Sequence, residues 1–323
     1  MRLGFAVKVL GAGGLPSHDT RRWQSDPHLR VSLEALRGIL AYLEDQEIRM
    51  YRMTAGLAPY ATHPDLPQFR GQVEACAPEL AEIGRLAHRA DIRLSTHPGQ
   101  YIVLNSVDPD IRDGAIRDLE LQADLMDAMG LGPEAVVVLH VGGAPDGVAA
   151  GIDRFEAGFA LLSERARRRL VVENDDRTYA LRDVLPLARR IGRPVVWDIL
   201  HHHCHDPEGI PDREALTLAC ATWEPGVTPK IHYSSPRTNV EERKKKVGRR
   251  VERSLVLPQL RAHADLIDPI GFEEFVTRTS AGLEVDVMLE AKAKDLALLR
   301  LREQLAARGL HPERGQGPLE AAA

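Results

Sequence analysis

Nine side chains of the types that bind divalent metals recur along this chain, most of them at the end of a short apolar run. They are His63, His97, His140, Glu173, Asp198, His201, His232, His263 and Glu290. The runs read VVVL before His140, VV before Glu173, VVW before Asp198 and VML before Glu290. A charge at the end of a buried run is costly unless it is paired or bound to a metal. A series from six or seven successive runs therefore predicts one polynuclear metal centre.

The types of donor narrow the metal and the chemistry. Imidazole and carboxylate ligands without a clear thiolate suit Mn²⁺, Zn²⁺ or Fe²⁺ better than Mg²⁺. One ion takes about four to six ligands, and nine donors are more than one ion can use, so two or three ions are expected. Clustered divalent ions activate water and stabilise the attacking and leaving oxygens of an in-line phosphoryl displacement. Phosphodiester hydrolysis is therefore the first reaction to consider.

These side chains need a scaffold that brings the ends of many strands together. Eight apolar runs read as strands, over residues 3–10, 48–54, 92–96, 135–140, 170–173, 194–198, 230–233 and 285–290. Between them lie segments with apolar residues three and four positions apart, such as Leu33, Leu36 and Leu40. Apolar strands separated by amphipathic helices predict a parallel sheet covered by helices.

Eight such units favour a single (β/α)8 TIM barrel, with a doubly wound sheet as the alternative. In a barrel the C-terminal ends of the strands converge on one mouth, where the βα loops build the active site. In an open sheet the polar strand ends would be strung out along an edge. We expect one barrel domain over residues 1–308, followed by a flexible tail over residues 309–323.

The composition fits this scaffold. The 323 residues are 44% hydrophobic and 28% charged, as in a soluble globular protein. No run reads as a signal peptide or a membrane helix, and three scattered cysteines suit a reducing cytoplasm. The net charge of −5 does not indicate a particular class of binding partner, because a locally basic surface patch is compatible with it. The glycine-rich segment 11–14 lacks a following GK[ST] and predicts a turn.

Two motifs at strand ends allow more than one interpretation. Asp198 and His201 form a D-x-x-H pair that could reach one ion, and a solvated His-rich loop is the alternative. Lys230 precedes His232 by two residues, so both face the same side of a strand. A lysine beside a histidine ligand must pair with a carboxylate or be chemically altered. An ordinary salt bridge is as compatible with the sequence as a modified lysine.

Polar residues also follow two other strands. His97 opens the sequence HPGQY, a tight turn that would hold Gln100 and Tyr101 out over the barrel mouth. Glu173 is followed by Asn and two Asp residues, and Asp175 or Asp176 is predicted to be a helix N-cap.

Several short strings together resemble a known family. They are HPGQY (97–101), VEND (172–175), Asp198 with His201, KIHYSS (230–235), HAD (263–265) and MLEAK (288–292). In this order they resemble the UV damage endonuclease family, which is related to endonuclease IV. The resemblance implies a barrel with three divalent ions, usually Mn²⁺, with Zn²⁺ or Co²⁺ as alternatives. It also implies ATP-independent nicking of damaged double-stranded DNA immediately 5′ to a lesion, leaving a 3′-hydroxyl.

The resemblance implies roles for individual residues. The nine side chains above would be the metal ligands, with Glu173, Lys230 and Glu290 as catalytic residues. Lys230 would be the lysine that can be carboxylated beside the metals. Gln100 and Tyr101 would probe the damaged strand by entering the space of the extruded nucleotides.

The chain departs from the family pattern in its first strand. Phe5 stands where the family often has a tyrosine, so a phenolic hydrogen bond near the lesion is expected to be absent. Lys8 and Val9 stand where an asparagine is usual. Lys8 and Ser234 are assigned to DNA contact.

A second departure is a long basic stretch between Ser235 and His263. Its basic side chains are Arg243, Lys244, Lys245, Lys246, Arg249, Arg250 and Arg253. Beside a barrel mouth such a run would meet phosphates and add salt-dependent affinity for DNA. A solvated helix is the alternative, because three glutamates interleave with the basic residues.

Two other classes of function remain open. A xylose-isomerase-like sugar isomerase or epimerase would use a set such as Glu173, Asp198, His232 and Glu290, although the extra histidines favour the larger cluster. A non-catalytic DNA-damage-binding protein would not need nine ligands. The endonuclease interpretation predicts a cytoplasmic monomer, associated with the nucleoid when it acts on DNA, without a nucleotide cofactor or a membrane partner.

Overall fold

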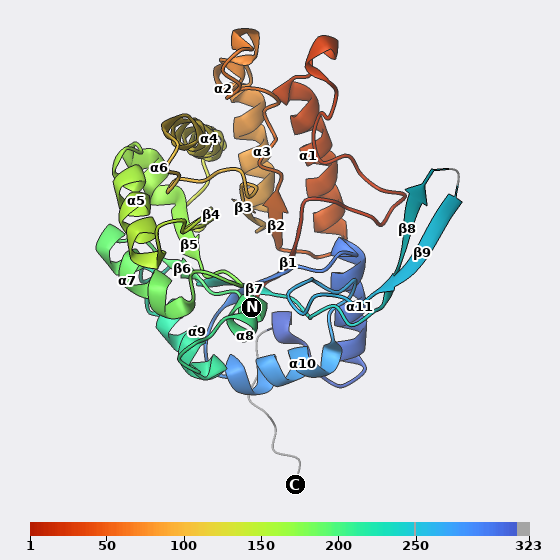
Figure 1. The fold of residues 1–323 in the computed structure, drawn as a ribbon. Helices are drawn as coiled ribbons and strands as arrows, with labels where there is room; N and C mark the ends of the chain where they lie inside the picture. The colour runs from red at the N-terminus through yellow and green to blue at the C-terminus, as the bar shows by residue number, and fades with distance from the viewer. Residues whose placement is uncertain (249, 315–323) are drawn as a thin grey trace.

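The structure is a computed structural model that describes residues 1–248 and 250–314, and these form a parallel β-barrel surrounded by helices (Figure 1). The barrel strands are β1 (Leu3–Ala6), β2 (Met50–Met53), β3 (Arg93–Thr96), β4 (Val137–His140), β5 (Leu170–Glu173), β6 (Val195–Val196), β7 (Lys230–Tyr233) and β10 (Asp286–Leu289). Hydrogen bonds join them in the order β6-β5-β4-β3-β2-β1-β10-β7. A parallel bridge between Asp198 and His232 brings the two ends of this sheet together. The predicted TIM barrel is confirmed.

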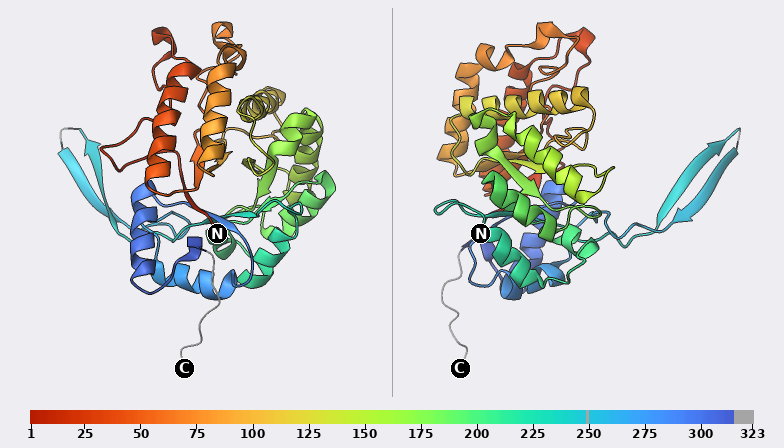
Figure 2. Two further views of the ribbon diagram at one scale, coloured as in Figure 1. Left: turned by 180° about the vertical axis from the view of Figure 1, so that it is seen from behind. Right: turned by 60° about the vertical axis from the view of Figure 1, so that its left-hand side comes forward.

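Helices follow the strands around the outside of the barrel (Figures 1 and 2). They are α1 (Leu29–Asp45), α2 (Gln72–Ala75), α3 (Ala77–Arg89), α4 (Pro109–Ala128), α5 (Val148–Ala160), α6 (Glu164–Arg169), α7 (Leu181–Ile191), α8 (Ile199–Cys204), α9 (Asp212–Cys220), α10 (Pro269–Glu274) and α11 (Lys294–Ala306). A π-helical turn, Phe275–Thr279, continues α10. Within the described ranges, the helices are all too short or too polar to span a bilayer.

Alternation along the strands decides which side chains face the helices and which face the barrel interior. Successive strand residues point to opposite faces. Phe5 and Tyr51 face the helices, and their rings meet edge to face with 5.4 Å between centroids. Helix α1 covers this surface with Leu33, Leu36 and Leu40, which are buried at the spacing that the sequence predicts. The polar residues at alternate positions are thereby directed into the barrel.

All eight predicted strands are present, although several are shorter than predicted. Strand β1 ends at Ala6 because Val7 adopts a left-handed backbone with a φ of 65°, which is rare for a β-branched residue. The Lys8 N–H then turns back and donates to the Ala6 carbonyl at 2.8 Å. The following glycines form the predicted turn, in which Gly13 and Gly14 have φ values of 80° and 84°.

A buried ion pair occupies the barrel interior near the amino-terminal ends of the strands. Arg93 Nη1 lies 2.9 Å from Asp286 Oδ2, and the two side chains are 0% and 3% exposed. The same guanidinium donates to the carbonyls of Thr228 and Glu134 at 2.7 and 3.0 Å. Asp286 also accepts from the backbone N–H of Arg2 at 2.8 Å. The pair therefore links β3 to β10 across the barrel.

We predict that Asp286→Ala lowers the free energy of unfolding by about 3–5 kcal/mol, because it leaves the Arg93 guanidinium buried and unpaired. Chemical denaturation followed by circular dichroism measures this loss. Glu303→Ala is the control, because it breaks an ion pair with Arg300 whose side chains are both largely exposed, and it should change stability little. A loss for Asp286→Ala no larger than that of the control would contradict the prediction.

The segment predicted as a tail starts with ordered contacts. Pro312–Arg314 form a short 3-10 helix, and Glu313 Oε1 accepts from Arg302 Nη2 at 2.7 Å. The remainder of the predicted tail, residues 315–323, lies outside the described residues.

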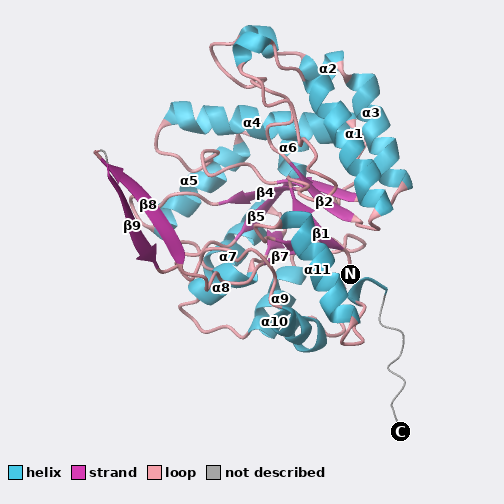
Figure 3. Cartoon of the chain, turned by 90° about the vertical axis from the view of Figure 1, so that its right-hand side faces the viewer, coloured by secondary structure: helices cyan, strands magenta, loops and turns pink. Residues whose placement is uncertain are grey.

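The basic stretch forms an antiparallel hairpin of β8 (Glu241–Val247) and β9 (Arg250–Val256). The solvated helix that the sequence left open is therefore wrong. Figures 2 and 3 show the hairpin projecting away from the barrel, on the side opposite the amino terminus. Because β7 leads into it and the loop before α10 follows it, the hairpin leaves from the side on which the strands end.

Candidate metal centre

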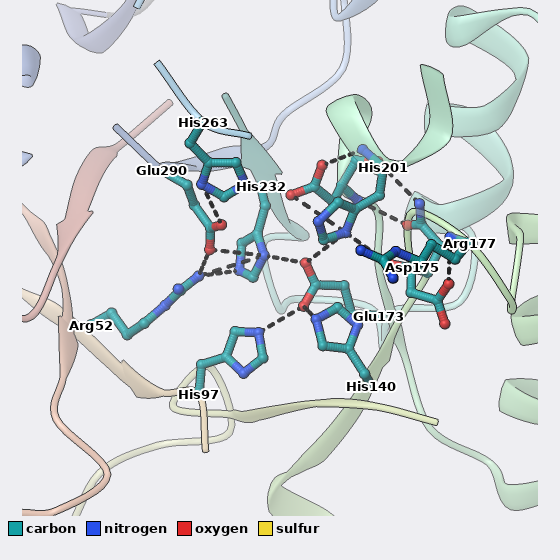
Figure 4. A network of polar contacts seen from close by, with 12 residues as sticks. Arg52, His97, His140, Glu173, Asp175, Arg177, His201, His232, His263 and Glu290 are labelled. Atoms are coloured by element: carbon teal, nitrogen blue, oxygen red, sulfur yellow. Dashed lines mark hydrogen bonds and ion pairs between the residues drawn. The ribbon is translucent and has the colours of Figure 1, made fainter. Parts of the chain in front are cut away.

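The predicted ligands lie at the carboxyl ends of the barrel strands. His140 and Glu173 end β4 and β5 and are paired in register. His97, Asp198 and Glu290 follow β3, β6 and β10 within one or two residues. Because the ends of the strands converge at the mouth of a barrel, these side chains meet, and Figure 4 shows His97, His140, Glu173 and Glu290 pointing toward one another.

Glu173 is the centre of the cluster and is 1% exposed. Its Oε1 lies 2.6 Å from His232 Nδ1, and its Oε2 lies 2.9 Å from His97 Nε2 and 3.4 Å from His140 Nε2. His201 Nδ1 is 3.8 Å from Oε1. One buried carboxylate is therefore surrounded by four imidazoles from different segments of the barrel mouth.

Glu290 organises the other side of the cluster. Its Oε1 lies 3.5 Å from His232 Nδ1, and its Oε2 lies 3.6 Å from His263 Nδ1. Asp198, His232 and Glu290 each offer a ligand atom within 4.8 Å of the others, and two similar groups of three surround Glu173. In the described part of the chain, eight of the nine predicted ligands are thus brought together.

His63 is the predicted ligand that the structure does not bring to the cluster. It is exposed in the loop after β2. Among the described residues its side chain contacts Asp65, whose backbone N–H donates to His63 Nδ1 at 3.2 Å, and the ring of Tyr60 at 6.4 Å between centroids. Its role as a ligand stays a prediction.

The hydrogen bonds of two imidazoles fix which of their ring nitrogens faces the cluster. His97 Nδ1 lies 3.1 Å from the Pro98 carbonyl oxygen, and His201 Nδ1 lies 3.0 Å from that of Asn174. A carbonyl only accepts, so each Nδ1 carries a proton and Nε2 of a neutral ring keeps its lone pair. Burial lowers the pKa of His97 and favours the neutral ring. His97 Nε2 and Glu173 Oε2 are then two acceptors 2.9 Å apart, an arrangement that a shared ion would stabilise.

Buried atoms without partners support the same conclusion. Glu173 Oε2, Asp198 Oδ2 and His140 Nδ1 have no hydrogen-bond partner among the described residues. A buried polar group left unsatisfied costs about 1–3 kcal/mol, and more if it is charged. Burial raises the pKa of Asp198 to about 7, which shows how unfavourable its charge is without a cation. The residues therefore fit a centre of divalent ions.

Arg52 belongs to the cluster, although it is not among the residues predicted from the sequence. Its Nη2 lies 2.7 Å from His232 Nε2 and 2.5 Å from Glu290 Oε1, and its side chain is 9% exposed. Burial raises the pKa of Glu290, but the charge of Arg52 together with the neighbouring His232 and His263 outweighs burial and lowers that pKa below its usual range. The sequence contained a signal for this residue. An arginine inside the apolar run MYRM is a buried charge, and burying it is as costly as burying the charged ligands.

Lys230 lies fully buried beneath the cluster, and its Nζ donates to Ser95 Oγ at 2.9 Å. Burial, together with the charges of Arg52 and Arg93, lowers the pKa of Lys230 well below its usual value. No carboxylate among the described residues lies within salt-bridge distance of it. The ordinary salt bridge that the sequence allowed is therefore wrong, and burial favours the neutral form of the amine.

Asn174 and the aspartates after it have structural roles. Asn174 Nδ2 donates to the Asp198 carbonyl at 3.0 Å, and its Oδ1 accepts from the Asp198 N–H at 2.9 Å. Asp175 Oδ1 accepts from two backbone N–H groups of the next turn, at 2.8 and 2.5 Å. Helix α7 has Ala180 as its N-cap. The prediction that Asp175 or Asp176 is a helix N-cap is therefore wrong.

The residues predicted to contact DNA surround the mouth. Tyr101 is 80% exposed, and Gln100 is exposed beside it in the loop after β3. Lys8 is exposed after β1. Ser234 directly follows β7 and is buried, with no hydrogen-bond partner for its Oγ among the described residues. Phe5 is fully buried against Tyr51, and the absence of a phenolic hydrogen bond near the lesion stays a prediction.

The remaining predicted DNA contacts lie in the hairpin. Its exposed basic side chains among the predicted residues are Arg243, Lys245, Lys246 and Arg250. Lys244 lies in β8, and Arg249 lies outside the described residues.

The comparison with known families identifies the kind of protein that carries this cluster. The model of the family described as UV-endonuclease UvdE matches residues 28–313. This chain belongs to the UvdE family. A UV DNA damage endonuclease of Bacillus velezensis is 32% identical over 268 residues, which cover 82% of this chain and 78% of that protein. One from Bacillus mycoides is 33% identical over 272 residues, covering 84% and 79%.

Solved structures agree with membership of the UvdE family. The crystal structure of SacUVDE matches with a TM-score of 0.80 and 30% identity, over 96% of this chain and 99% of that one. A D-psicose 3-epimerase from Clostridium cellulolyticum matches with a TM-score of 0.53 and 12% identity, over 96% and 97% of the two chains. At 12% identity the epimerase shows only that the two proteins share a barrel fold. The match says nothing about the reaction.

Proposed function

We propose that this chain is a DNA-repair endonuclease that hydrolyses the phosphodiester bond immediately 5′ to UV photoproducts and other lesions. The reaction would need no ATP and would use two or three divalent ions at the barrel mouth, with Mn²⁺ proposed first and Zn²⁺ or Co²⁺ as alternatives. Membership of the UvdE family, with relatives named UV DNA damage endonuclease, supports a DNA-repair endonuclease. The observation that carries the finer proposal is the set of buried imidazoles around Glu173.

The geometry suits phosphodiester hydrolysis. Glu173, Asp198 and Glu290 would hold the ions together with the imidazoles. Such ions activate water and stabilise the attacking and leaving oxygens of an in-line displacement. Arg52 adds a fixed positive charge beside Glu290, which would attract the scissile phosphate. Asn174 fixes the backbone of Asp198 through its two hydrogen bonds, so the ligand stays oriented.

Lys230 is proposed to be carboxylated and to act in catalysis. In its neutral form the amine can attack carbon dioxide: the nitrogen forms an N–C bond, one C=O π bond opens onto oxygen, and one N–H proton is released to leave a carbamate. We expect a carbamate signal in the ¹³C NMR spectrum of protein equilibrated with labelled bicarbonate, and its loss in Lys230→Met. Because the carbamate would lie next to the ligands, nicking by the variant should fall by about 10–100-fold. Identical spectra for the two proteins would contradict the modification.

Gln100 and Tyr101 are expected to serve damage recognition. Taking nucleotides out of the stack costs a few kcal/mol, which inserted side chains can partly offset. Replacing both with alanine should weaken binding to a duplex with a pyrimidine dimer by about 10–100-fold, because stacking contributes about 1–3 kcal/mol per base. Binding to undamaged duplex should change little. Fluorescence anisotropy measures both affinities.

Val107→Ala provides the control for this pair, since Val107 is 64% exposed in the same loop. It should leave both affinities unchanged. Equal losses of affinity for damaged and undamaged duplex in the Gln100 and Tyr101 variant would rule out the probe role.

Relaxation of irradiated supercoiled plasmid separates the proposal from its alternatives. The endonuclease should nick irradiated plasmid in preference to unirradiated plasmid, and a chelator should stop it. A non-catalytic damage-binding protein would retain the irradiated plasmid in a gel without relaxing it. A sugar isomerase or epimerase would convert ketoses and ignore the plasmid.

The partner proposed for this chain is damaged double-stranded DNA. We propose that it acts as a monomer, without a nucleotide cofactor or membrane partner, in the cytoplasm and at the nucleoid. The exposed loop residues Gln100 and Tyr101 and the basic hairpin, all on the side where the strands end, support DNA as the partner.

A further inference from the structure

The β8–β9 hairpin is a free two-stranded ribbon. Seven residues of each strand pair in register from Glu241↔Val256 to Val247↔Arg250. Figures 2 and 3 show the ribbon standing clear of the helices, and most of its described side chains are exposed. An isolated ribbon of this kind is marginally stable in water. Its surface is therefore suited to binding something outside the barrel.

The base of the ribbon is tied to the metal centre. The Arg237 N–H donates to the Ala262 carbonyl at 2.7 Å, and the Ala264 N–H donates to the Ser235 carbonyl at 2.9 Å. Between these bonds an antiparallel bridge joins Pro236 to the candidate ligand His263. The ribbon thus starts at a fixed position beside the mouth.

One face of the ribbon is both apolar and cationic. Side chains on a strand alternate between faces, so Val251, Arg253 and Leu255 share a face with Lys246, which is paired in register with Val251. Val251 and Leu255 are 59% and 78% exposed. Arg253 contacts Glu242 of the same face at 3.1 Å.

The opposite face is mostly charged, with Val256 as a half-buried apolar member at its base. It carries Arg243, Lys245 and Arg250 together with Glu252, which is paired in register with Lys245. The largely exposed apolar side chains of the ribbon, Val251 and Leu255, therefore lie on one face, and this face is the better candidate for contact with a partner.

The charge of the ribbon differs in sign from that of the whole chain. Residues 241–256 contain seven basic and three acidic side chains, a net charge of +4, whereas the whole chain carries −5. Positive charge concentrated beside the mouth of a nuclease complements the phosphates of DNA. The major groove admits a two-stranded ribbon, and apolar side chains there contact thymine methyl groups.

We infer that this ribbon is an arm that grips undamaged duplex to one side of the lesion, with the Lys246–Val251–Arg253–Leu255 face in the major groove. The inference rests on the proposed function, because it takes the mouth to be where the lesion binds. Seven residues at about 3.3 Å each span about 23 Å, or about seven base pairs at 3.4 Å. The arm therefore extends the binding site along one flank of the lesion.

Two variants with the same change in charge test which face binds. Lys246→Ala with Arg253→Ala alters the proposed contact face, and Lys245→Ala with Arg250→Ala alters the opposite one. Affinity for undamaged duplex is measured by anisotropy across a salt series with the metal-loaded protein, because undamaged duplex is not the proposed substrate for cutting. The first variant should flatten the slope of log affinity against log salt by about 1.8, at about 0.9 per phosphate contact. The second should leave the slope close to that of the wild type, because the inference restricts the DNA contacts predicted for the hairpin to one face and takes Lys245 and Arg250 out of them. Equal slopes in all three proteins, or a change only in the second variant, would overturn the inference.

Deletion of the arm tests its reach. Replacing residues 241–256 with two glycines keeps the pairing of residues 235–237 with 262–264 that closes the base. The lesion duplex is shortened on one flank or on the other. Shortening the flank under the arm removes phosphates that the arm contacts, so the affinity of the wild type should fall about tenfold or more. Shortening the other flank should not cause such a loss. The deletion variant should show no such asymmetry. Equal sensitivity to both flanks in the wild type would overturn the inference. Both tests measure affinity and not cutting. A protein that binds in this way but never nicks DNA would therefore refute the proposed function without refuting the role of the arm.

Discussion

Glu173→Gln is expected to abolish nicking of a lesion-containing duplex while the protein stays folded. Glutamine keeps the shape of the side chain but removes the charge around which four imidazoles are arranged. Losing one such group at a preorganised, buried centre costs about 100–1,000-fold in rate, and weaker metal binding adds to the loss. The nicking rate is measured under single-turnover conditions, with circular dichroism to verify the fold.

The matched control for this variant is Glu156→Gln. It removes the same charge from α5, where the carboxylate pairs with Arg190 and both side chains are partly exposed. This control should nick at the wild-type rate. Near wild-type nicking by a folded, metal-loaded Glu173→Gln protein would remove the basis for a catalytic cluster at the mouth.

Removal of metal is expected to destabilise the protein as well as inactivate it. Without cations the carboxylates of Glu173, Asp198 and Glu290 lie close together in a buried site with unsatisfied oxygens. A ligand present at 1,000 times its Kd stabilises the folded state by about 4 kcal/mol. Dialysis against chelator should therefore lower the unfolding temperature by several degrees, and stoichiometric Mn²⁺ should restore it. Thermal unfolding followed by circular dichroism measures the change.

Ligand variants provide the control for metal removal. Glu290→Gln should unfold at a temperature that responds less to added Mn²⁺, because one of the cluster carboxylates is missing. Mg²⁺ should restore the wild type less well than Mn²⁺, since imidazole ligands suit Mn²⁺ better. An unfolding temperature that does not change with chelator or metal would show that the cluster binds no ion.

The barrel and most of the cluster could be predicted because buried charges are rare. An apolar run that ends in histidine or a carboxylate, as at His140 or Glu173, marks both a strand and its functional end. The periodicity of helices such as α1 then identified the covering layer. These signals are local, so they can be read from a single sequence.

Other features depended on distances that the sequence does not contain. Arg52 faces inward because β2 pairs in register with β1 and β3, and only the closed barrel brings it to Glu290. His63 resembles the other ligands in type, yet the chain places it in an exposed loop. Asp175 resembled a helix cap, but its helix starts several residues later.

The hairpin was the hardest element to predict. Its strands lack the alternation of apolar and polar residues that a half-buried strand shows, because neither face packs on the barrel. Lysine and glutamate, frequent in β8, also favour helices more than strands. Charge alone could indicate a surface that meets phosphate, but not the shape of that surface.

The central claim is that the metal cluster cuts DNA immediately 5′ to a lesion, and mapping the cut on one defined substrate tests it most directly. The substrate is an end-labelled duplex with a single pyrimidine dimer, incubated with Mn²⁺-loaded protein, with and without chelator. We predict one product that ends directly 5′ to the dimer and carries a 3′-hydroxyl that a polymerase can extend, formed only without chelator. An uncut substrate, or a cut that persists in chelator, would contradict the claim.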